Sequence, residues 1–178
     1  AGIAGISLIA EEKALLLNKE QEDQQTTVYL KGVDDNYKNV TGVAAKTIEG
    51  KFETGTAADP GLIVGYGIQN AAAVNVSEQL NASTLTIILP KKGKVDVNDP
   101  MNSLSEGNAI ATGVFSVQQE FDNKYAITNI DFVKQQMGFA ADEFSAVEIK
   151  LQPNTNLQLL QQQTQQLLGN NIQVQTKY

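Results

Sequence analysis

The sequence contains no cysteine, histidine, tryptophan or arginine, and each absence excludes a class of chemistry. Without thiolate or imidazole side chains, the chain cannot build a structural zinc site, an iron–sulfur cluster, a Cys–His pair or a Ser–His–Asp triad. Without arginine, it lacks the planar guanidinium fork that binds phosphate and carboxylate. Any catalysis would therefore have to use carboxylates, lysine, serine, threonine or tyrosine.

Basic charge and long apolar runs are also scarce. The 178 residues include 13 lysines and 20 acidic residues, for a net charge of −7. This balance argues against nucleic acid and anionic membrane surfaces as partners, because both attract basic proteins. No run of about 18 apolar residues exists, so we expect no segment that spans a bilayer. The sequence starts without an initiator methionine or a basic signal-peptide region, and we expect a fragment of a longer protein.

The first half of the chain reads mostly as strands. Alternating and β-branched residues predict strands over residues 3–17, 27–33, 62–64 and 84–89. Tyr37, Val40, Ala44 and Ile48 recur at helical spacing, which predicts a helix with Asp34 or Asp35 as its N-cap and Gly50 as its stop. A shorter, alanine-rich helix is expected over residues 68–74.

In the second half, a long polar stretch from Lys91 to Asn108 predicts a mobile loop, because loops of this length are uncommon unless they are functional or disordered. Strands are expected over residues 110–117 and 125–130, and a helix from Asp131, as its cap, to Met137. The last forty residues predict strand–helix–strand, over 145–151, a leucine-striped helix and 172–176. The stripe consists of Leu157, Leu160, Thr164, Leu167 and Leu168.

This element order indicates an α+β fold. The two ends of the chain are interpreted as one α+β sandwich, and the β-rich middle as an insertion into it. If the first and last strands lie near each other in one sheet, both ends of the chain can face the same side.

No motif for a catalytic, cofactor or metal site survives inspection. Gly65-Tyr66-Gly67 lacks the third glycine of a dinucleotide turn, and neither Gly-Lys pair is followed by the Ser or Thr of a phosphate loop. The stretch 96–100 resembles the start of a calcium loop, but Pro100 breaks the pattern. We therefore expect no catalytic residue, no cofactor and no metal ligand. A carboxylate-based hydrolase stays open as an alternative, and it would need two carboxylates about 5–10 Å apart in a cleft.

Five segments, in order, resemble one family. They are Gly61 to Asn70, Thr84 to Pro90, Gly113 to Asp122, Ala126 to Met137 and Phe144 to Leu151 with the closing helix and strand. Together they look like the extracytoplasmic domain of ABC-transporter permeases of the lipoprotein-releasing LolC/LolE type and the MacB type, within the FtsX-like superfamily. The lipoprotein-releasing branch is the nearest in appearance.

The resemblance implies a fold and a role. Residues 1–60 and 139–178 would form a porter-like α+β subdomain, and residues 61–138 an inserted, β-rich, Sabre-like subdomain. The domain would lie at the periplasmic face of the bacterial inner membrane, between two transmembrane helices outside this sequence. It would be no enzyme itself.

The same resemblance implies partners. An ABC ATPase subunit and a second permease copy or paralogue would act through the full-length protein, and ATP hydrolysis would drive lipoprotein release. The domain would bind cargo, a periplasmic carrier or an adaptor. The alternative is MacB-like export or FtsX-like regulation, with contact to an adaptor or a wall hydrolase. The partner-binding residues stay unknown, and the stretch Lys91 to Asn108 is the first place to look.

Overall fold

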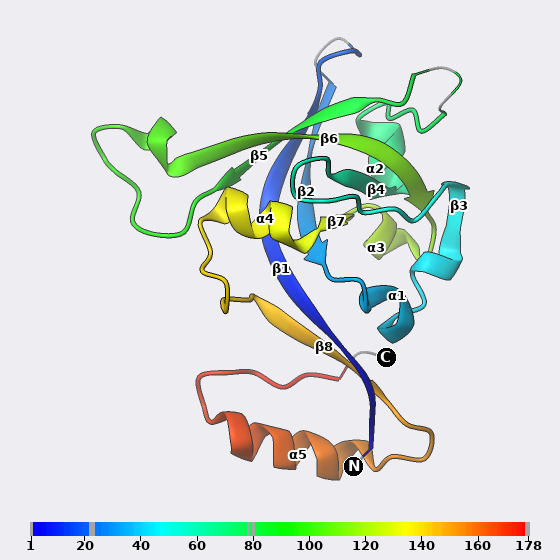
Figure 1. Ribbon diagram of the computed structural model, residues 1–178, viewed down its shortest axis with the longest axis vertical. Helices are drawn as coiled ribbons and strands as arrows, with labels where there is room; N and C mark the ends of the chain where they lie inside the picture. Colours follow the sequence, from blue (N-terminus) through cyan, green and yellow to red (C-terminus); the bar gives the residue numbers. More distant parts are fainter. Residues whose placement is uncertain (1, 22–23, 78, 80, 177–178) are drawn as a thin grey trace.

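Strand β1 (Ile3–Asn18) runs from one end of the molecule to the other and organises the rest (Figure 1). Its first half pairs with β8 (Ala146–Leu151), and its second half pairs with β2 (Gln24–Val33) on one edge and β5 (Thr84–Pro90) on the other. The computed structural model describes residues 2–21, 24–77, 79 and 81–176. The sequence expectation of strands over 3–17 and 27–33 is thereby confirmed.

The second half of β1 closes a barrel. Around it, strands follow in the order β1, β2, β7 (Tyr125–Asn129), β4 (Gly61–Gly65), β6 (Leu104–Phe115) and β5, which returns to β1. The β2–β7 and β4–β6 pairs are parallel, and the remaining neighbours are antiparallel. Strand β3 (Thr47–Gly50) adds to β6 outside this path. The barrel leaves β8 with β1 as a two-stranded ribbon that projects from it (Figure 1).

Alternation along the strands produces two apolar clusters. The larger one takes alternate residues from each barrel strand, together with residues of α2 (Tyr66–Ala71) and α4 (Ile130–Met137). Leu16, Leu30 and Leu85 in this cluster are fully buried. The smaller cluster lies on the opposite strand faces and includes Tyr37 of α1 (Tyr37–Val40) and Phe115. Burial of this kind, on alternate positions, is what fixes the strand register.

Two further helices complete the fold. The short α3 (Gln119–Asp122) leads into β7, and α5 (Leu157–Leu168) follows β8 at the end of the molecule away from the barrel (Figure 1). Helix α4 ends at Gly138, which has a φ of 72° and supplies the left-handed conformation that commonly ends a helix. Its N-cap is Asn129, whose side chain accepts from the N–H groups of Asp131 and Phe132. The expectation of Asp131 as the cap was two residues too late.

The helix predicted from Tyr37 to Ile48 is wrong. The chain leaves α1 at Thr41, which is extended with φ −114° and ψ 161°, makes a single 3-10 turn at Ala44–Lys46, and then enters β3. Pairing of β3 with β6 overrides the helical spacing, and Gly42 within the segment lowers its helix propensity further. Neither Asp34 nor Asp35 caps α1, because its N-cap is Asn36.

Two expectations for the second half are corrected. The loop predicted over Lys91 to Asn108 is shorter than expected, because residues 104–108 already belong to β6 and pair with β5. The strand predicted over 172–176 is absent from the described residues, although β8 and α5 before it are where the sequence placed them. The division into 1–60 with 139–178 and 61–138 stays a prediction. Strands from both parts share one sheet.

Candidate functional site

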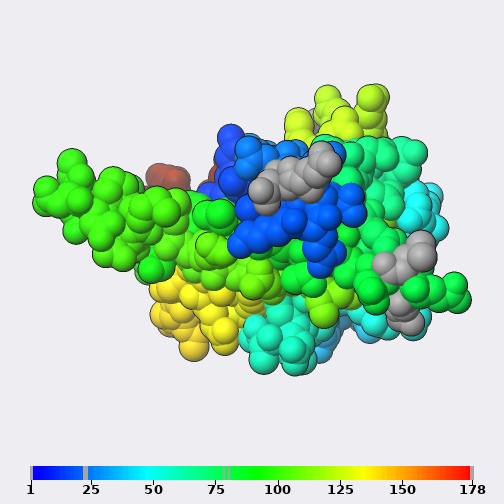
Figure 2. Space-filling model, turned by 90° about the horizontal axis from the view of Figure 1, so that it is seen from above, coloured from blue at the N-terminus to red at the C-terminus, as the bar shows by residue number. Residues whose placement is uncertain are grey.

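The β5–β6 hairpin extends well beyond the barrel and presents its tip to solvent. Figure 2 shows this hairpin, in green, standing out from the rest of the surface. Its strands pair continuously from Thr84 with Ile110 to Pro90 with Leu104. Residues 91–103 form the tip, which ends in a 3-10 turn (Pro100–Ser103).

The tip exposes three large apolar side chains. Val97 is 89% exposed, Met101 74% and Val95 63%. Three lysines and two aspartates lie in the same segment. Exposed apolar side chains gathered on a projecting element, with charged residues around them, are typical of a surface that contacts another protein.

Hydrogen bonds hold the base of the hairpin in place. The Lys92 backbone N–H donates to the Met137 carbonyl at the end of α4, at 2.8 Å. The Lys92 ammonium lies 2.6 Å from the carboxylate of Glu143, and this hydrogen bond, with one from the Ala140 N–H, lowers the pKa of Glu143. Within the tip, Asp99 accepts from the Asn102 side chain at 2.7 Å. The tip therefore sits on a fixed base while its apolar side chains stay exposed.

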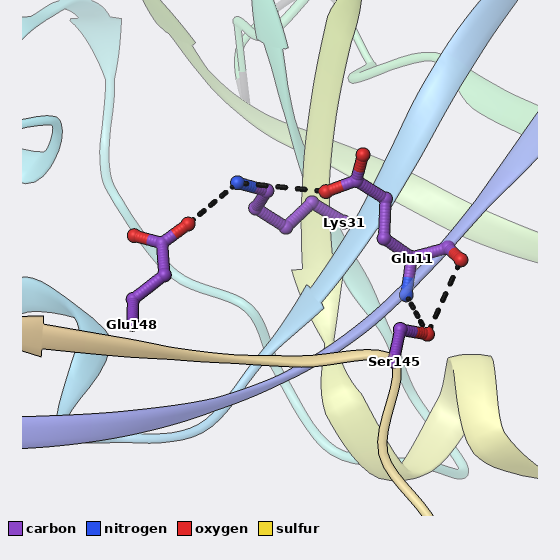
Figure 3. A network of polar contacts seen from close by, with 4 residues as sticks. All are labelled: Glu11, Lys31, Ser145 and Glu148. Carbon is purple, nitrogen blue, oxygen red and sulfur yellow. Dashed lines mark hydrogen bonds and ion pairs between the residues drawn. The ribbon is translucent and has the colours of Figure 1, made fainter. Parts of the chain in front are cut away.

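A buried lysine connects three strands near the base of the ribbon (Figure 3). The Lys31 ammonium on β2 lies 2.8 Å from Glu148 Oε1 on β8 and 3.5 Å from Glu11 Oε2 on β1. Its side chain is 3% exposed, and it also lies 5.2 Å from the centre of the Tyr125 ring. Beside it, Ser145 Oγ accepts from the Glu11 backbone N–H at 2.9 Å.

The surroundings of Lys31 keep it charged. Burial alone would lower its pKa, but the nearby Tyr37 and the Glu148 and Glu11 carboxylates outweigh burial, so the pKa of Lys31 lies above its ordinary value. Burial raises the pKa of Tyr37 to about 12, against the opposing effect of Lys31. A charged lysine with two carboxylates on different strands forms a link that ties β8 to the barrel.

A small hollow of about 350 Å³ lies near the start of α1. Its lining includes three carboxylates, of Asp34, Asp35 and Glu53, together with Lys38. Both oxygens of Asp34 are engaged by β1: Oδ1 accepts from Ser7 Oγ at 2.7 Å and Oδ2 from the Leu8 N–H at 2.9 Å. This aspartate therefore holds the loop after β2 against β1.

Neither a metal site nor a membrane span is found in the part of the chain that the structure describes. Those residues hold no group of three or more acidic, histidine or cysteine side chains that could bind a metal ion. None of the helices in that same part is long and apolar enough to cross a membrane.

Sequence reasoning found one of these features and missed another. The stretch from Lys91 was singled out for partner contacts, and its first thirteen residues form the exposed hairpin tip. Lys31 was missed, although it stands between apolar residues at the end of a predicted strand. A lysine on the buried face of a strand is a signal for an ion pair, but the sequence cannot say which carboxylates face it.

No protein-family model and no curated protein matches the sequence. Solved structures similar to it include two transporter domains. The periplasmic region of MacB from Actinobacillus actinomycetemcomitans aligns over 94% of this chain and 67% of that one, with a TM-score of 0.59 and 14% identity. The extracellular domain of the noncanonic ABC-type transporter YknZ from Gram-positive bacteria aligns over 96% of this chain and 76% of that one, with a TM-score of 0.58 and 15% identity. The resemblance drawn from the ordered segments is thereby confirmed at the level of the fold.

Proposed function

We propose that this chain is the extracytoplasmic domain of an ABC-transporter permease and performs no reaction itself. The observation that carries the proposal is the fold, which is shared with the MacB and YknZ domains over nearly the whole chain. The porter-like and Sabre-like division of the domain is part of the same proposal. A cytoplasmic ATPase would supply the energy, and the domain would work outside the membrane, at the periplasmic face of the inner membrane.

The positions of the chain ends support this role. The Gly2 carbonyl accepts from the Gln152 N–H at 2.8 Å, just before α5. The segment after α5 returns to the same lower part of the molecule (Figure 1). Both ends can therefore continue toward one membrane surface, as a domain inserted between two transmembrane helices requires.

The Lys31 link gives the domain a way to transmit movement. Force applied at the chain ends enters through the β1–β8 ribbon, which is the part of the sheet nearest to them (Figure 1). The ion pairs of Lys31 with Glu148 and Glu11 join this ribbon to the barrel, which carries the hairpin. Contiguous rigid contacts of this kind can carry coupling between distant sites.

The hairpin tip would contact the partner. Its exposed apolar side chains are Val95, Val97 and Met101. Our first candidate for the transported molecule is a lipoprotein, received from the domain by a periplasmic carrier, as the sequence resemblance implies. The alternative, which the fold of MacB favours, is export or regulation through an adaptor or a wall hydrolase.

Site-specific photocross-linking tests the hairpin. A photoreactive residue at Val97 should capture an envelope protein in living cells, whereas one at Ile48 on β3, across the molecule and 52% exposed, should not. A lipoprotein or its carrier in the product favours release, an adaptor with an outer-membrane channel favours export, and a wall hydrolase favours regulation. Equal capture at both positions, or none at Val97, would show that the tip is not the contact.

A further inference from the structure

The β1–β8 ribbon has one covered face and one open face. On the covered face, Ser7 binds Asp34, and the Lys150 ammonium donates to the Asn39 carbonyl in α1 at 2.9 Å. Cross-strand register places Ile6 opposite Ile149 on the other face. Four apolar side chains of that face are 41% to 50% exposed; they are Ile3, Ile6, Val147 and Ile149. An open face of this composition is expected to be covered by another element.

Strand β8 also offers an unused edge. It ends the strand order, and among the described strands it pairs with β1 alone. Its second row of backbone N–H and C=O groups is therefore available to a further strand. Such an edge next to an apolar face is where a sheet can grow.

Helix α5 has an apolar stripe and little to pack it against. None of its 12 residues is buried, and Leu157 and Leu168 on the stripe are 46% and 47% exposed. The helix is about 18 Å long at 1.5 Å per residue. Strand β8, with 6 residues, is about 20 Å long at 3.3 Å per residue. The helix therefore matches the open face in both length and composition.

The segment after α5 is bound to the helix through glutamine side chains. Gln161 Nε2 donates to the Val174 carbonyl at 2.9 Å, and Gln165 Nε2 donates to the Ile172 carbonyl at 2.7 Å. Gln165 Oε1 accepts from the Val174 N–H at 3.1 Å. In an extended chain, the backbone groups of Gln173 and Gln175 point to the opposite edge. Figure 1 shows this segment running back along α5 in the same direction as β8.

We propose that α5 and residues 172–176 close as one unit over the open face of the ribbon. In the closed arrangement, the leucine stripe of α5 covers Ile6 and Ile149, and residues 172–176 pair with the edge of β8 as a parallel strand. A strand, a crossover helix and a second strand parallel to the first form the βαβ unit, which is common in proteins. The structure then describes the open arrangement.

We assign the open face of the ribbon to the chain's own α5, because a short linker holds this helix beside it. Only residues 152–156 separate β8 from the helix, so the helix stays beside the ribbon at high effective concentration. The Gly2 carbonyl accepts from the Thr155 hydroxyl in this linker at 3.3 Å, which holds the start of α5 close to the end of β1. A second copy of the chain or another protein would have to displace this tethered helix.

Cysteine cross-linking tests the closure, and the chain has no native cysteine to interfere. In the whole chain, the pair Ile149→Cys with Leu160→Cys should form an intramolecular disulfide under mild oxidation at least tenfold faster than Ile149→Cys with Gln162→Cys. Gln162 is two residues after Leu160, lies on the opposite face of α5 and serves as the matched control. Equal rates would overturn the proposal, and so would disulfide-linked dimers as the main product at low micromolar concentration, which would point to a second copy.

A proline variant tests the strand separately. Gln175→Pro, added to the Ile149–Leu160 cysteine pair, removes an N–H that faces β8 and should slow disulfide formation severalfold. The melting temperature should stay unchanged, because α5 and the residues after it contribute nothing to the buried clusters. An unchanged disulfide rate would refute the addition of residues 172–176 to β8.

Discussion

Replacing Lys31 by methionine tests the link between the ribbon and the barrel. The side chains of Lys31, Glu148 and Glu11 are 3%, 13% and 28% exposed, so the lysine charge is buried and its partners are partly buried. Methionine keeps the length of the aliphatic stem but leaves both carboxylates without their cation. Removing one partner of a buried pair costs about 3–5 kcal/mol, because the remaining charge is left uncompensated.

That cost converts into a shift in melting temperature. With an unfolding entropy of about 2.1 cal/mol/K per residue, 178 residues give a shift of roughly 8–13 °C. Thermal and urea unfolding followed by circular dichroism would measure it. In the double variant Lys31→Met with Glu148→Met, the main uncompensated charge is gone, and most of the lost stability should return.

An exposed ion pair provides the control. Lys19 and Glu106 lie 3.4 Å apart, and their side chains are 57% and 58% exposed. Because exposed pairs contribute about 0–1 kcal/mol, Lys19→Met should barely change the melting temperature. If Lys31→Met is no more destabilising than Lys19→Met, or if the double variant shows no recovery, Lys31 is not the link that we describe.

Two further predictions concern pH and packing. The raised pKa of Tyr37, about 12 against an ordinary 10.0, means that the folded state holds this proton more tightly, so the free energy of unfolding should fall as pH rises above about 10. Lys31, whose pKa is also raised, acts in the same direction. Tyr37→Phe should make the free energy of unfolding, measured with urea, fall less steeply between pH 9 and 11. An unchanged dependence on pH would contradict the raised pKa of Tyr37. At Gly32, an added Cβ would lie 2.8 Å from a side-chain carbon of α4, so Gly32→Ala should cost about 1–3 kcal/mol. At Gly42, nothing lies within 4 Å, and Gly42→Ala should leave the melting temperature unchanged or slightly raised; similar effects of the two substitutions would contradict the packing of α4 on β2.

Strands were predictable from this sequence because their signal is local. Apolar residues at every second position, such as Leu85 and Ile87 on β5, indicate a strand with one buried face, and both side chains are completely buried in the structure. The segment from Tyr37 to Ile48 shows where local reasoning fails. Apolar residues recur there at helical spacing, but of these only Tyr37 is buried, and Ile48 lies in a strand that is fixed by pairing with the distant β6. The closing of the barrel could not be foreseen, because it depends on pairings between strands far apart in the chain, such as β2 with β7 and β1 with β5.

The candidate site shows the same limit. The length and polarity of the stretch from Lys91 drew attention to the hairpin tip. The projection of that tip follows from the long register between β5 and β6, which a single sequence does not reveal. Burial of Lys31 could be suspected from its place in a strand. Its partner Glu148 lies 117 residues further along the chain, and only the fold brings the two together.

Membrane topology of the native protein is the most direct test of the proposed role. An antibody raised against the chain would follow the protein through cell fractionation, and protease would be added to intact cells with a permeabilised outer envelope. The account predicts that the protein remains in the membrane fraction after alkaline extraction and that protease removes this domain from outside. Recovery of the native protein in the cytoplasmic fraction, protected from protease, would contradict it.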